Sequence, residues 1–119
     1  MLNSFLKYVP KATFIQLSTN KVYGDNPNKI NLKESTLRFE PSDIKKYKNG
    51  FNEKLSTDHC THSFFGVSKT YADYLAQEFG KNYNLKVGVF RAGCISGPSH
   101  SGAKLHGFLS FLVKSCMTK

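Results

Sequence analysis

HSFFGVSKTYADYLAQEFGKNYNLKVGVFRA, residues 62–92, predicts a helix followed by a strand. Ser63 can cap the helix, which we expect to run to about Asn82, and apolar side chains recur along it at helical spacing. The apolar run Lys86–Ala92 then predicts a strand. We interpret four side chains near one helix face as core packing: Phe64, Tyr71, Leu75 and Phe79.

A second strand is predicted upstream, in the run ATFIQLS of residues 12–18. Its apolar pattern is nearly continuous rather than alternating, which is typical of a parallel sheet covered on both faces. A strand, a long helix and a second strand form the unit of a parallel sheet, and the crossover should be right-handed. The sequence therefore predicts an α/β fold with a parallel sheet and flanking helices.

The remaining segments are loops and two further helices. Residues 25–62 are polar, contain several Pro, Asn and Gly residues and lack periodicity, so we expect a long loop within the domain. A short helix over Ser42–Tyr47 is compatible with this segment. After the second strand, GCISGPSHSG (93–102) predicts a glycine- and serine-rich loop, and His106–Cys116 predicts an apolar helix.

Size and charge narrow the class of protein. A chain of 119 residues suits one soluble domain, and no apolar run approaches the roughly 20 residues of a membrane span. We expect no membrane partner, no cleaved leader and, by default, a cytoplasmic location. The net charge is +9, and the basic residues that produce it are spread along the chain. Only two of them are arginines, the residue type best suited to reading base edges, so a generally basic surface is favoured over a nucleic-acid partner.

The cysteines and histidines give no strong metal pattern. Cys60, Cys94 and Cys116 are odd in number and widely spaced, which indicates reduced thiols. The segment DHCTH brings His59, Cys60 and His62 together, but no second ligand pair accompanies it. We therefore predict no metal site.

Polar loops leave the carboxyl ends of both predicted strands, where open parallel sheets bind ligands. Thr19 follows the first strand directly, whereas Phe65 and Lys69 lie four residues apart on one face of the helix. A hydroxyl, a phenol and a lysine in such positions would form a proton-transfer centre. Phe65 occupies the place of the phenol and carries no hydroxyl.

Three blocks, in the order STNKVYGD (18–25), FGVSKTYADYL (65–75) and FRAGCISGP (90–98), resemble the extended short-chain dehydrogenase/reductase family. Among its NAD-dependent nucleotide-sugar epimerases and dehydratases, the blocks are most similar to the CDP-paratose 2-epimerase (CDP-tyvelose epimerase) group. The resemblance implies NAD as cofactor, a nucleotide-sugar substrate, transient hydride transfer at a sugar carbon, and a parent protein that could be a homo-oligomer.

The resemblance also implies an incomplete, Rossmann-like domain over residues 1–119. Family members begin with a strand and a G-x-x-G-x-x-G loop, and this chain contains no such loop. The segment MLNSFLKYVP (1–10) resembles the second half of a helix. We expect an internal fragment that lacks the glycine-rich half and is inactive by itself.

Matched residue by residue, the resemblance implies roles at five positions. Thr19 corresponds to the catalytic, substrate-binding Ser/Thr, and Lys69 to the lysine that binds the nicotinamide ribose and tunes the tyrosine. The backbone at Gly93 corresponds to a contact with the nicotinamide end of the cofactor, and Cys94 stands where many relatives use Asn to touch the sugar. Phe65 stands at the tyrosine position and cannot transfer a proton.

Two alternatives stay open for the base and two for the function. His62, or a water held by Lys69, could replace the tyrosine, whereas Tyr71 points about 200° away from Lys69 and Tyr23 is interpreted as packing in the turn. The loss of the phenol also allows a catalytically silent homologue that binds a nucleotide or sugar. A basic nucleic-acid-binding module is the weakest alternative, because no recognition motif accompanies the charge.

Overall fold

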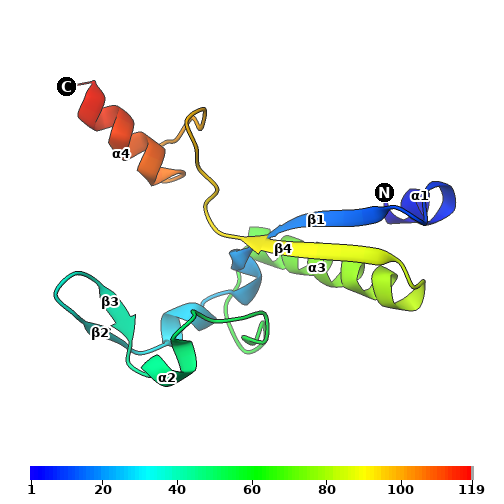
Figure 1. Ribbon diagram of the computed structural model, residues 1–119, viewed down its shortest axis with the longest axis horizontal. Coiled ribbons are helices and arrows are strands. Elements are labelled where there is room, and N and C mark those ends of the chain that lie inside the picture. Colours follow the sequence, from blue (N-terminus) through cyan, green and yellow to red (C-terminus); the bar gives the residue numbers. More distant parts are fainter. Residues whose placement is uncertain (119) are drawn as a thin grey trace.

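The computed structural model describes residues 1–118 and contains a small parallel sheet with helices (Figure 1). The elements are, in chain order, α1 (Leu2–Tyr8), β1 (Thr13–Thr19), η1 (Asn20–Tyr23), η2 (Asn26–Lys29), β2 (Leu32–Glu34), β3 (Phe39–Pro41), α2 (Ile44–Tyr47), α3 (Phe64–Asn82), β4 (Lys86–Ala92) and α4 (Phe108–Met117). No helix in this part of the chain has both the length and the apolar character needed to cross a bilayer.

Strands β1 and β4 pair in parallel, from Thr13 opposite Lys86 to Thr19 opposite Ala92. The long helix α3 connects them through the chain and contacts both strands. This arrangement confirms the predicted strand–helix–strand unit and the α/β fold class. Because the two strands end level with each other, Asn20 and Gly93 leave the sheet at the same edge.

One face of this sheet is covered and the other is open within residues 1–118. Phe14 lies on the covered face and packs against Phe5 of α1, with 5.4 Å between the ring centroids. On the opposite face Ile15, Leu17 and Phe90 are each more than half exposed. The expectation that both faces are covered is therefore wrong for the described residues.

Helix α3 begins and ends where the sequence predicts. The Ser63 hydroxyl accepts a hydrogen bond from the Gly66 N–H at 3.0 Å, which caps the first turn. The buried residues of α3 are Gly66, Asp73 and Ala76, whose spacing of seven and three places them on one face.

The predicted core role of the helix aromatics is wrong at two positions. Phe64 is 98% exposed and Tyr71 is 67% exposed, whereas Leu75 and Phe79 are half-buried. Phe64 and Tyr71 fall about half a turn away from the buried Gly66 and Asp73, so helical periodicity identified the stripe but only its Leu75 and Phe79 end is packed.

The long polar segment is more structured than its sequence indicates. It contains η2, the antiparallel pair β2–β3 with Leu32 opposite Pro41, and the short helix α2, whose place confirms the helix expected near Ser42–Tyr47. Both short strands are largely exposed, so they lack the apolar alternation by which strands are recognised. At the other end of the chain, α4 confirms the predicted apolar helix and lies apart from the sheet (Figure 1).

Candidate active site

The carboxyl ends of β1 and β4 and the first turns of α3 meet around the η1 turn. Thr19 ends β1 in an extended conformation, and its hydroxyl accepts a hydrogen bond from the Lys21 N–H at 3.3 Å. The same hydroxyl lies 3.4 Å from the Asn20 carboxamide oxygen, to which it donates. The half-buried Thr19 side chain is thus oriented by the turn that follows the strand.

A glycine allows α3 to start directly against this turn. A β-carbon at Gly66 would lie 3.0 Å from the Lys21 carbonyl oxygen and 3.4 Å from the β-carbon of His62. A β-carbon at this position would require its neighbours to move by a few tenths of an ångström, so glycine permits the close approach of α3 to η1. The close approach brings the helix that carries Lys69 next to the turn that orients Thr19.

Phe65 and Lys69 contact each other on the first turns of α3. The Lys69 Nζ lies 5.6 Å from the centroid of the Phe65 ring, a separation at which an ammonium is attracted to an aromatic face. No carboxylate of residues 1–118 lies within ion-pair distance of Lys69. The Lys69 ammonium can therefore donate hydrogen bonds to a ligand that enters this edge.

The phenols nearest to this edge are engaged or face elsewhere. Tyr23 is buried, as predicted, and its hydroxyl accepts a hydrogen bond from Arg91 Nη1 at 3.1 Å. The Tyr74 hydroxyl is bound to the Thr57 hydroxyl, and Tyr71 is largely exposed. None of these three phenols occupies the place of the hydroxyl that Phe65 lacks.

His62 is fastened to the η1 turn. Its Nε2 lies 2.8 Å from the Val22 carbonyl oxygen, which can only accept, so this nitrogen carries a proton and donates. Cys60 Sγ lies 3.8 Å from each ring nitrogen of His62. Among residues 1–118 no three His, Cys, Asp or Glu side chains are grouped as metal ligands.

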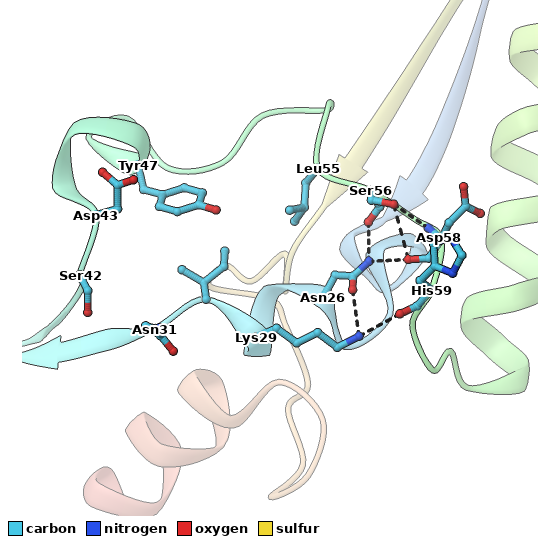
Figure 2. Close-up of a pocket in the computed structure, with 11 residues that line it drawn as sticks. Asn26, Lys29, Asn31, Ser42, Asp43, Tyr47, Leu55, Ser56, Asp58 and His59 are labelled. Carbon is cyan, nitrogen blue, oxygen red and sulfur yellow. Dashed lines mark hydrogen bonds between the residues drawn. The ribbon is translucent and has the colours of Figure 1, made fainter.

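Hydrogen bonds fasten the end of the long polar segment to its beginning, an arrangement that the sequence did not predict (Figure 2). Asn26 Nδ2 donates to the carbonyl oxygens of Ser56 at 2.8 Å and Asp58 at 3.0 Å, and Lys29 Nζ donates to that of His59 at 3.0 Å. A cavity of about 540 Å³ lies beside these bonds. Several of its polar lining side chains, including those of Asn26, Lys29 and Ser56, make hydrogen bonds within the chain, and asparagines at turn positions were the sequence signal.

Asp25 also joins the beginning of the long polar segment to its end. Its carboxylate pairs with Lys29 at 3.2 Å and accepts a hydrogen bond from the Thr61 N–H at 3.1 Å. The hydrogen bond from Lys29, followed by that from Thr61, holds the pKa of Asp25 below its ordinary value. The start of α3 is thereby anchored, through residues 59–62, to the turn after β1.

The backbone after β4 is open on one side. A β-carbon at Gly93 would meet no atom within 4 Å, and Cys94 is exposed. A flat ligand can therefore approach the Gly93 backbone without displacing a side chain. Gly93 and Lys69 lie on separate elements, and they offer a ligand open backbone polar groups and an ammonium without a carboxylate partner among residues 1–118.

Beneath this edge lies a buried polar cluster that the sequence did not predict: Asp73, Arg91, Ser18, Gln77 and Tyr23. Asp73 is fully buried and is paired with Arg91 at 2.9 Å. Burial by itself would raise the pKa of Asp73, but hydrogen bonds from Arg91, Ser18 and Gln77 outweigh it and hold the pKa below its ordinary value. The same pairing raises the pKa of Arg91. An arginine inside an otherwise apolar strand was the sequence signal.

Comparison with known proteins found two matches. Residues 1–119 match the family described as "NAD dependent epimerase/dehydratase family". The chain is similar to the CDP-paratose 2-epimerase of Salmonella typhi, with 31% identity over 97 residues that cover 82% of this chain and 27% of that protein. The chain thus spans about a quarter of the length of the curated relative it matches.

Proposed function

Because this chain belongs to the NAD dependent epimerase/dehydratase family, we propose that it forms the catalytic edge of an NAD-dependent enzyme acting on a nucleotide-activated sugar. The observation that supports this most is the placement of Lys69, whose ammonium has no carboxylate partner among residues 1–118 and lies where α3 meets the strand ends. Parallel sheets bind their ligands at this edge.

Each proposed role uses chemistry that the residue has. The Thr19 hydroxyl, oriented by η1, binds and polarises a sugar hydroxyl. The Lys69 ammonium donates hydrogen bonds to the ribose hydroxyls of the nicotinamide nucleotide, and the open backbone at Gly93 borders the nicotinamide. NAD, when bound, supplies the acceptor and donor of hydride. Cys94 would contact the sugar through a thiol instead of the carboxamide common in relatives.

Proton transfer needs a group other than Phe65. A phenyl ring has no ionisable proton, and His62 uses Nε2 to donate to the Val22 carbonyl. A water bound by Lys69 is the substitute we propose, because an ammonium stabilises the hydroxide character that a base requires. After this water has lost a proton to bulk solvent, the resulting hydroxide would take the proton of the sugar hydroxyl, and the water so formed would return a proton when that hydroxyl is restored.

A second function is favoured by one specific observation, the substitution at Phe65. In that case the chain binds a nucleotide or nucleotide-sugar at the same edge without turnover. Epimerisation at a sugar carbon by the native chain, or by a protein that contains it, would exclude this silent function. Activity that arises only after Phe65→Tyr would establish it.

Calorimetric titration of the chain with NAD and with a CDP-linked sugar tests the shared part of both functions. We expect saturable but weak binding, because the chain contains no G-x-x-G-x-x-G loop to hold the pyrophosphate. The binding should weaken further in Lys69→Gln, because the substitution removes the ammonium and keeps an unbranched polar side chain. Lys81→Gln is the matched control, since Lys81 lies at the far end of α3, where it pairs with Glu78. Equal losses in both variants, or no binding of either ligand to the native chain, would contradict the proposed function.

A further inference from the structure

A single buried carboxylate joins three elements of the sheet edge. Asp73 Oδ2 accepts hydrogen bonds from Ser18 Oγ at 3.0 Å and from Arg91 Nε at 2.9 Å. Asp73 Oδ1 accepts from Arg91 Nη2 at 3.0 Å and from Gln77 Nε2 at 2.6 Å. Four donors from β1, β4 and α3 therefore converge on one side chain that has no exposed surface.

These partners stand next to the residues of the candidate site. Ser18 precedes Thr19 in β1, and Arg91 lies two residues before Gly93 at the end of β4. Ser18 and Arg91 are also direct partners in the parallel register. Asp73 itself follows Lys69 by one helical turn. Each proposed ligand contact is therefore close along the chain either to Asp73 or to one of its hydrogen-bond partners.

Arg91 extends the cluster to the turn after β1. Its Nη1 donates to the Tyr23 hydroxyl at 3.1 Å, and its guanidinium carbon lies 5.0 Å from the centre of the Tyr23 ring. Tyr23 is the last residue of η1, the turn whose backbone orients the Thr19 hydroxyl. One guanidinium thus fixes the end of β4 relative to both α3 and η1.

Stability of the fold alone does not explain why this helix–sheet contact contains a buried ion pair rather than apolar side chains. The sheet-facing side of α3 carries small residues, Gly66 and Ala76 among them, and apolar side chains of similar volume can replace a buried ion pair at little or no cost. An apolar contact tolerates sliding of a helix over a sheet, whereas four directed hydrogen bonds are satisfied by one arrangement. The cluster is suited to fix a geometry.

We propose that Asp73 is a positioning residue, which sets the relative placement of Thr19, Lys69 and Gly93 by holding Ser18, Arg91 and its own helix in one arrangement. This inference rests on the function proposed above for those three residues. Asp73 itself contacts neither cofactor nor substrate in this scheme.

Amide chemical shifts measured by NMR test the inference without any ligand. Asp73→Asn keeps the shape of the side chain but removes its charge, and Ser18→Ala removes one of the four donors. We expect either variant to move the amide signals of Lys69 and Gly93 together, and Asp73→Asn to move that of Thr19 as well. In Ser18→Ala the Thr19 signal is not used, because any substitution of the preceding residue shifts it. Glu78→Gln, on the exposed side of α3, is the control and should leave all three signals in place.

A purely structural role predicts a different result: a lower unfolding midpoint with the Lys69 and Gly93 amide signals unchanged in the folded protein. That result in Ser18→Ala would overturn the inference, and this variant provides the test even if Asp73→Asn fails to fold. Titration with NAD adds a second readout, in which we expect the dissociation constant to rise at least about fivefold in Ser18→Ala. If the native chain binds no NAD, the proposed function fails, while the amide shifts still test the positioning role.

Discussion

Replacing Phe65 by tyrosine would place a phenol beside the Lys69 ammonium. Nζ lies 5.6 Å from the ring centroid, and two unit charges at that distance attract by about 0.7 kcal/mol in water and about 3 kcal/mol at an effective dielectric constant of 20. The Phe65 side chain is 54% exposed, so the aqueous end of this range applies. An attraction of about 0.7 kcal/mol raises the acid dissociation constant of the phenol about threefold.

The assay is a spectrophotometric pH titration of phenolate, with the native chain subtracted. Phe64→Tyr is the matched control, because Phe64 is the adjacent residue, is 98% exposed and points about 100° away from Phe65 around the helix axis. We expect the introduced phenol in Phe65→Tyr to ionise at lower pH than the one in Phe64→Tyr. The difference should disappear when Lys69→Gln is added.

Superimposable titrations of the two single variants would refute the reasoning, because they would show that Lys69 does not act on the ring it faces. A difference that survives Lys69→Gln would assign the effect to another group. In either case the water that we propose as base would lose its main support, since it relies on the same ammonium.

Three further predictions concern the architecture that supports the site. Gly24 has φ +55°, and a β-carbon there would lie 2.8 Å from both Cys60 Sγ and the Thr61 carbonyl oxygen; Gly50 has φ +81° with nothing within 4 Å. Urea unfolding should therefore show that Gly50→Ala lowers the free energy of unfolding by about 1 kcal/mol, from backbone strain alone, and Gly24→Ala by about 2–5 kcal/mol. Equal losses in the two variants would contradict the close approach at Gly24. Ser63→Ala should destabilise α3 by about 1 kcal/mol through loss of its cap, measured as lower helicity by circular dichroism. Because the folded-state pKa of Asp73 lies below its ordinary value of 3.8, Asp73 stabilises the fold above that pH, and this stability is lost as the pH falls through the folded-state pKa. Acid unfolding should thus become shallower in Asp73→Asn, and an unchanged profile would refute the assignment.

Much of the fold was predictable, because its main elements have strong local sequence signals. β1 and β4 are short apolar runs, and α3 has both a serine cap and helical periodicity, so their bounds were predicted to within about a residue. The polar pair β2–β3 was not predicted, since exposed strands need no apolar alternation. The fastening of residues 56–62 to the turn after β1 joins segments thirty or more residues apart, and local patterns do not record such pairings.

For the candidate site, the sequence by itself determined which residue types lie near the strand ends: Thr19 at the end of β1, Phe65 and Lys69 one turn apart on α3, and Gly93 after β4. Chain order and the geometry of a parallel crossover suffice for that. Only the tertiary structure decided which face of α3 is buried. Phe64 and Tyr71 of the apolar stripe are exposed, whereas Asp73 faces the sheet because Ser18 and Arg91 satisfy its charge there. A carboxylate can be buried only where donors from other elements converge, and that convergence exists in three dimensions alone.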